Sequence, residues 1–142
     1  MRAFLGRDHA RIEGLHERLM DLAEGGDRPE RRELWRRFQR AVLDHMAVED
    51  RLLERFGSVQ AAEATVLREQ HAELRRLLDE AGRDLAHHHP RLQAFITLFH
   101  DHALREDGVF YRWADEVLDP ATQTEVAREL AESDRASALG RR

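Results

Sequence analysis

Hydrophobic residues recur at spacings of three and four along most of the chain, which is the pattern of α-helices with one buried face. Glycine and proline interrupt this pattern and divide it into four long helices, expected at about residues 4–24, 29–56, 58–86 and 90–118. Ser58 is expected to be the N-cap of the third helix. A fifth, short helix is expected to begin at Pro120 and to fade into a polar tail after about Ser133.

Four long helices with short connections predict an all-α fold of the up-down-up-down kind. We expect an antiparallel four-helix bundle over residues 1–118, followed by a short C-terminal fifth helix and polar tail over residues 119–142. The connections are expected at residues 25–28 and 87–89.

Two polar residues lie in the buried stripe of the second helix, where apolar residues are the rule. His45 and Glu49 are four residues apart, so they lie one turn above each other on the same face. The stripe that contains them consists of Phe38, Val42, His45, Glu49, Leu52 and Phe56. A histidine and a carboxylate at the centre of an apolar stripe need partners inside the core.

The fourth helix repeats this arrangement with His102 and Glu106. Residues 45–56 and 102–113 align without a gap, and His, Glu, Asp and a late Arg are identical in the two segments. The stripe expected here consists of Leu92, Phe95, Phe99, His102, Glu106, Val109 or Phe110, Trp113 and Val117. The repeat predicts two helices that present equivalent His-x3-Glu pairs to the core.

The first and third helices each carry a lone histidine on the buried face, His9 and His71. At a rise of about 1.5 Å per residue, these histidines and the two His-x3-Glu pairs lie at the same height along the bundle to within a turn of helix. His9, His45, Glu49, His71, His102 and Glu106 are therefore expected in one layer of the core.

Composition narrows the class of protein. The chain of 142 residues is long enough for one domain, and its net charge of -5 argues against a nucleic-acid-binding protein. Cysteine is absent, which excludes disulfides and thiolate metal sites. No apolar run reaches the roughly 20 residues of a membrane span and no signal-peptide pattern opens the chain, so we expect no membrane partner and a cytoplasmic location.

The chemistry of the expected layer favours a metal centre. Each buried polar side chain left unsatisfied would cost about 1–3 kcal/mol, and charged carboxylates would cost more. Imidazoles and carboxylates together suit iron, manganese or zinc better than calcium or magnesium. Six ligands are too many for one tetrahedral zinc but fit two ions bridged by two carboxylates, each ion with two histidines. A structural bundle without metal, with an internal hydrogen-bond network, is the alternative.

The order His, His-x3-Glu, His, His-x3-Glu along four helices resembles the hemerythrin-like (HHE cation-binding) domain family over about residues 4–118. The segments Asp8-His9 and Glu69-Gln70-His71 are similar to the family as well. The resemblance implies two non-haem iron ions bridged by Glu49 and Glu106. It places His9 and His45 on one iron and His71 and His102 on the other. It also implies a small ligand such as dioxygen, peroxide or nitric oxide.

Two positions differ from the oxygen-carrying members of the family. Those carriers have a further histidine one turn from the third-helix ligand, where this chain has Leu67 and Arg75. They also use an aspartate at the spacing of Asp107, but Glu106 is preferred here because it lies on the stripe and repeats Glu49. His16 is open as a core residue or a substitute ligand, and Tyr111 and Trp113 are expected in the core rather than as redox relays.

These residues are compatible with more than one function. The protein is expected to bind dioxygen, peroxide or nitric oxide, or to sense or store iron, and the ligand gap argues against reversible oxygen carriage. A di-iron enzyme for peroxide dismutation or nitric oxide reduction would use the same ligands. The sequence leaves the oligomeric state undetermined.

Overall fold

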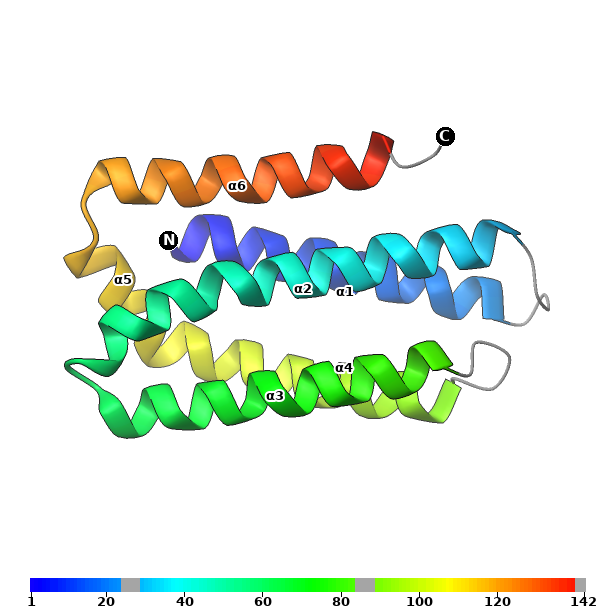
Figure 1. Ribbon diagram of the computed structural model, residues 1–142, viewed down its shortest axis with the longest axis horizontal. Coiled ribbons are helices and arrows are strands. Elements are labelled where there is room, and N and C mark those ends of the chain that lie inside the picture. Colours follow the sequence, from blue (N-terminus) through cyan, green and yellow to red (C-terminus); the bar gives the residue numbers. More distant parts are fainter. Residues whose placement is uncertain (24–28, 84–88, 140–142) are drawn as a thin grey trace.

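The computed structural model describes residues 1–23, 29–83 and 89–139, and every element in these ranges is helical. The long helices are α1 (Arg2–Ala23), α2 (Pro29–Gly57), α3 (Ala61–Arg83) and α4 (His89–Arg105). A π-helical turn η1 (Glu106–Phe110) and α5 (Tyr111–Val117) prolong α4, and α6 (Pro120–Leu139) ends the described chain. Figure 1 shows α1 to α4 side by side along the long axis, with successive helices running in opposite directions. The predicted all-α antiparallel bundle is confirmed. Of the connections predicted at 25–28 and 87–89, residues 25–28 and 87–88 lie outside the described residues, and His89 is instead the first residue of α4.

The core consists of two separate hydrophobic clusters. The cluster toward the α1–α2 and α3–α4 connections includes Ile12, Leu19, Trp35, Phe38, Val42, Met46, Leu74, Leu78, Phe95 and Phe99. The cluster at the opposite end includes Leu5, Leu52, Leu53, Phe56, Leu67, Phe110, Tyr111, Ala114 and Leu118. On α1, α3 and α4 the predicted layer residues fall between the members of one cluster and those of the other, and on α2 the two clusters meet between His45 and Glu49, at Met46 and Val48. The predicted polar layer therefore separates two apolar cores.

The last turns of the fourth helix differ from the prediction. Of the two alternatives Val109 and Phe110, Phe110 is the buried one, while Val109 and the expected Val117 are about half exposed, and Ala114 and Leu118 follow Phe110 in the core. The five-residue turn η1 inserts one extra residue after Glu106, so the buried stripe moves by one position beyond that point. The gapless repeat in the sequence therefore does not correspond to two equivalent helices.

The extra residue in η1 can be tested by deletion. Gly108 is exposed and no heavy atom outside its own helix lies within 4 Å of where its Cβ would be. Its deletion is expected to leave a regular turn, with the spacing of His102 and Glu106 and the core register of Phe110 onward intact. The unfolding free energy should change by about 1 kcal/mol or less, so the melting temperature should move by about 4 °C or less.

The matched control is deletion of Leu104, which is 63% exposed but lies between His102 and Glu106. This deletion rotates Glu106 by about 100° relative to His102 and should abolish metal binding. Circular dichroism, thermal unfolding and metal content measure both variants. Equal loss of metal in the two variants would contradict the assignment of the extra residue to η1.

The C-terminal helix α6 is longer than predicted, at 20 residues, and continues beyond Ser133 to Leu139. Asp119 caps its first turn by accepting a hydrogen bond from the backbone N–H of Thr122 (2.7 Å), in agreement with the predicted start. Val126, Leu130 and Ser133 form a buried face, and α6 packs mainly against α2. Packing of this buried face stabilises α6, and this explains why the helix is longer than the polar composition of residues 131–139 suggested.

The N-cap assigned to Ser58 is wrong. The Ser58 hydroxyl donates to the carbonyl of Arg55 (2.7 Å), at the end of α2. The backbone N–H groups of Val59 and Gln60 also bond to the carbonyl of Phe56, which completes the last turn of α2. The third helix therefore begins at Ala61, a few residues later than predicted.

Candidate metal centre

Six buried side chains from four helices converge at the level between the two hydrophobic clusters. His9 comes from α1, His45 and Glu49 from α2, His71 from α3, His102 from α4 and Glu106 from the first position of η1. Their exposed fractions range from 0% for Glu49, His71 and Glu106 to 7% for His9. The structure therefore brings together all six residues that the sequence singles out, and their role as metal ligands stays a prediction.

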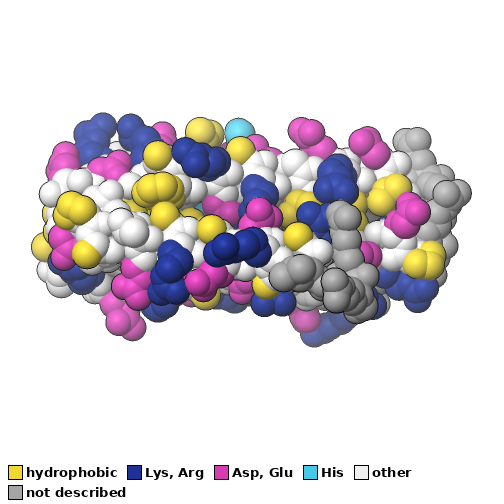
Figure 2. All heavy atoms as spheres, turned by 90° about the horizontal axis from the view of Figure 1, so that it is seen from above, with side chains coloured by type: hydrophobic (Ala, Val, Ile, Leu, Met, Phe, Trp, Pro, Cys, Tyr) yellow, Lys and Arg dark blue, Asp and Glu magenta, His cyan; other side chains and the backbone are white. Residues whose placement is uncertain are grey.

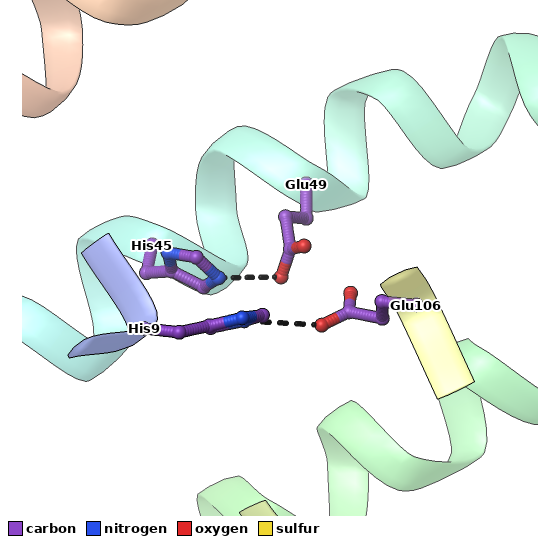
Figure 3. A group of neighbouring side chains, drawn as sticks. All are labelled: His9, His45, Glu49 and Glu106. Atoms are coloured by element: carbon purple, nitrogen blue, oxygen red, sulfur yellow. Dashed lines mark ion pairs between the residues drawn. The ribbon is translucent and has the colours of Figure 1, made fainter. Parts of the chain in front are cut away.

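Two overlapping groups of candidate ligand atoms make up this layer. One group contains His9, His45, Glu49 and Glu106 (Figure 3), and the other contains Glu49, His71, His102 and Glu106. Within each group one ligand atom per residue lies within 4.8 Å of all the others. The two glutamates belong to both groups, which is the arrangement that two ions sharing two carboxylates require.

The distances across the layer agree with ligands around a metal ion. The His Nε2 to carboxylate separations are 3.0 Å for His45–Glu49 and 3.1 Å for His102–Glu106. His9 lies 3.3 Å from Glu106, and His71 lies 3.5 Å from Glu49. Two ligand atoms at right angles, each about 2.1 Å from one ion, are about 3.0 Å apart.

The unsatisfied atoms of the layer are the atoms that would bind a metal. Among the residues that the structure describes, the Nε2 atoms of His45, His71 and His102 are buried without a hydrogen bond, despite their closeness to carboxylates. One oxygen of Glu49 and one of Glu106 are buried without a hydrogen bond as well. Such groups are costly unless something coordinates them, so the donor set fits a divalent or trivalent cation.

Hydrogen bonds behind three of the histidines leave Nε2 facing the layer. The Nδ1–H of His45 donates to Asp8 (2.8 Å) and that of His71 to Asp50 (2.6 Å). The Nδ1–H of His102 donates to the side-chain oxygen of Gln70 (2.7 Å). Each acceptor requires a hydrogen on Nδ1, so in the neutral imidazole the Nε2 lone pair is free for a metal.

The pKa values of the layer residues are shifted in the direction that favours positive charge in the layer. Burial lowers the pKa of His45, but Glu49 and Asp8 outweigh it and raise that pKa to about 10. Burial likewise opposes the charge on His71, whose pKa is raised to about 11 by Asp50, Glu106 and Glu49. The pKa of Glu49 is held well below its usual range, against the effect of burial, by His45 and His71. A metal cation would supply the same positive charge in place of the imidazole protons.

Tyr111 is buried as predicted, and it also belongs to the polar layer, which the sequence analysis did not predict. Its hydroxyl donates to Glu49 (2.7 Å) and lies 3.1 Å from Nε2 of His9 and 3.4 Å from Glu106. Burial, followed by the charges of Glu49 and Glu106, raises the pKa of this phenol well above 10, so the proton stays on the oxygen. On a regular helix Tyr111 would point about 140° away from Glu106, and the extra residue of η1 brings both to one face.

Other candidates from the sequence lie outside the layer. Asp107 is exposed and forms an ion pair with Arg2 (2.8 Å), which agrees with the preference for Glu106. His16 belongs to neither group of candidate ligands and packs against the ring of Phe38. Leu67 is fully buried in the second hydrophobic cluster, and Arg75 binds Asp50 at the bundle surface. Asp50 is part of the sequence repeat, but its contact with His71 was not predicted, because His71 lies on another helix.

Replacement of Tyr111 by phenylalanine tests the role of its hydroxyl. Because a hydrogen bond to a charged group contributes about 1.5–3 kcal/mol, the variant should be less stable by about that amount while it still binds metal. The spectrum of the metal-loaded protein should also change. Trp113→Phe is the control, since Trp113 contacts Phe56 and Phe110 outside the layer. A Tyr111→Phe protein with wild-type stability and spectrum would contradict this role.

The fold and the layer together define a helical bundle whose buried histidines and glutamates can hold metal ions. Residues 1–114 match the hemerythrin HHE cation binding domain family, and the chain belongs to that family. Comparisons with curated proteins and with solved structures found no match. No helix in the described ranges is long and apolar enough to cross a membrane.

Proposed function

We propose that this protein is a hemerythrin-like non-haem di-iron protein whose six layer residues are the metal ligands. Glu49 and Glu106 would be shared by the two ions, with His9 and His45 on one ion and His71 and His102 on the other. The observation that carries this proposal is the pair of ligand groups with both glutamates in common. Manganese or zinc would fit the same donors, but mixed imidazole and carboxylate ligation at two adjacent ions suits iron.

The residues around the two metal positions indicate a site that binds small molecules. The ion held by His71 and His102 would have two imidazoles and the shared carboxylates, because neither Leu67 nor Arg75 reaches the layer. An ion that commonly takes five or six ligands would then have a position for solvent or a diatomic molecule. The ligands proposed are dioxygen, peroxide or nitric oxide, in a protein that binds or senses them or stores iron.

A di-iron enzyme is the second candidate, and Tyr111 favours it. Dismutation of peroxide or reduction of nitric oxide requires protons at the reacting oxygen atoms. The Tyr111 O–H lies in the layer within hydrogen-bond distance of both glutamates and of His9, and bulk water does not reach it because the side chain is 1% exposed. When bound, iron supplies the redox chemistry, and the side chains hold the proton, the ligands and the dry environment.

Metal analysis with an optical spectrum of iron-replete protein tests the proposal. We expect about two irons per chain, near-ultraviolet absorption from the ferric site, and a spectral change with azide or nitric oxide. Reduced protein exposed to air should oxidise without a long-lived oxygen adduct. Protein without bound metal after metal-replete expression would support the structural alternative. An adduct that returns its oxygen under vacuum would instead identify a carrier.

A further inference from the structure

The C-terminal helix α6 lies outside the four-helix bundle, yet hydrogen bonds connect it to a candidate metal ligand. In Figure 1, α6 runs along the side of the bundle formed by α1 and α2. Asp134 on α6 accepts a hydrogen bond from Arg11 (3.0 Å), and Arg11 donates to Asp8 (2.8 Å). The other oxygen of Asp8 accepts the Nδ1–H of His45 (2.8 Å). We call these four residues the Asp134–His45 network.

The Asp134–His45 network leads continuously from solvent to the polar layer. The exposed fraction of the side chain falls from 56% at Asp134 to 20% at Arg11, 6% at Asp8 and 1% at His45. A cleft of about 210 Å³ between α1 and α6 is lined by Asp8, Arg11 and Asp134. The inner hydrogen bonds of the network are therefore shielded from water better than a surface ion pair.

The second metal position has a similar arrangement without the link to α6. His71 donates to Asp50, and Asp50 accepts from Arg75, so the order His, Asp, Arg is repeated. A groove of about 730 Å³ lies between Arg75 and the α6 residues Glu129, Glu132 and Ser133. Figure 2 looks onto the side of the molecule on which α6 lies in Figure 1, and acidic and basic side chains are interspersed over this face. The described contacts therefore attach α6 to one metal position and leave a groove beside the other.

We propose that α6 influences the His45 metal position through Arg11 and Asp134, which are positioning residues for His45. The inference rests on the proposed di-iron centre. A carboxylate that accepts the Nδ1–H of a ligating histidine orients the ring and makes it a better electron donor. Arg11 divides its charge between Asp8 and Asp134. Without Asp134, the guanidinium of Arg11 neutralises the Asp8 carboxylate more fully. Asp8 then becomes a weaker acceptor for the Nδ1–H of His45.

The experiment compares two substitutions that each remove one attachment of α6. Asp134→Ala removes the contact that leads to His45. Glu129→Ala is the matched control, because Glu129 pairs with Arg51 of α2, and that pair is outside the Asp134–His45 network. Each variant is loaded with iron, and its optical spectrum and the rate of iron transfer to an excess of chelator are recorded. Thermal unfolding reports the general effect of loosening α6.

We expect Asp134→Ala to speed the release of one of the two irons by about two- to fivefold, the range of a single charged contact. Its spectrum should shift, and the second iron should leave at the wild-type rate. Glu129→Ala should keep the wild-type spectrum and both release rates. In an Arg11→Ala background, Asp134→Ala should add no further change, since the described contact that joins it to Asp8 is gone.

Each of the following results would overturn the coupling. Equal effects of Asp134→Ala and Glu129→Ala would show that attachment of α6 in general is responsible. A full effect of Asp134→Ala in the Arg11→Ala background would show that Arg11 is not the connection. Protein that binds no iron would contradict the proposed function and this inference together. Protein that binds two irons without an effect of Asp134→Ala contradicts the coupling alone.

Discussion

Glu49→Ala is expected to remove one or both irons from the protein and, with them, the stabilisation that iron confers. Glu49 belongs to both ligand groups, so its loss leaves neither metal position complete. A ligand present at a hundred times its Kd stabilises the folded state by about 2.7 kcal/mol, and metal that cannot bind contributes nothing. The melting temperature in excess iron should therefore fall by about 5–10 °C relative to the iron-loaded wild type.

Metal content and thermal unfolding with and without iron measure this effect. Glu54→Ala is the matched control, because Glu54 lies on the same helix and is exposed. It should retain two irons and the wild-type response to iron. A Glu49→Ala protein that keeps two irons per chain would exclude Glu49 as the shared ligand.

Glu106→Ala has the second largest expected effect, and Asp107→Ala provides its comparison on the neighbouring residue. The Glu106 carboxylate is fully buried and lies 3.1 Å from His102, 3.3 Å from His9 and 3.7 Å from His71. Its removal should leave a mononuclear or empty site, with one iron per chain or none. Asp107 pairs with Arg2 at the surface, so its removal should change iron content little.

The spectrum of the iron-loaded variants distinguishes the two carboxylates. Signals of two coupled irons should disappear in Glu106→Ala and persist in Asp107→Ala. The opposite result would reassign the fourth-helix ligand to Asp107. It would also mean that η1 rearranges when metal binds, since Asp107 faces away from the layer in this structure.

The bundle and the position of the layer could be predicted because both depend on local regularities of the chain. Helical periodicity identifies the buried face of each helix, and constant rise per residue gives the height of each residue along it. His9 and His71 are predicted in the layer from their position on the buried face and their height along the helix, and the structure places both there. A pair such as His45 and Glu49 is visible in the sequence because both residues lie on one turn.

Contacts between side chains of different helices were not predictable, because the spacing of residues within one helix does not say which residue of another helix they contact. The hydrogen bonds from His45 to Asp8 and from His71 to Asp50 each join two helices. The packing of α6 against α2 involves the buried residues Val126 and Leu130, and the sequence predicted only a short helix here, without its partner.

The sequence by itself therefore determined the four-helix bundle, the family resemblance and the six residues of the layer. Only the tertiary structure decided that Tyr111 joins this layer and that the two His-x3-Glu helices differ beyond it. The reason is the π-helical turn at Glu106–Phe110, in which one extra residue rotates all following side chains. A constant helical period does not predict that rotation. The rotation depends on the packing of Phe110, Ala114 and Leu118 in the core.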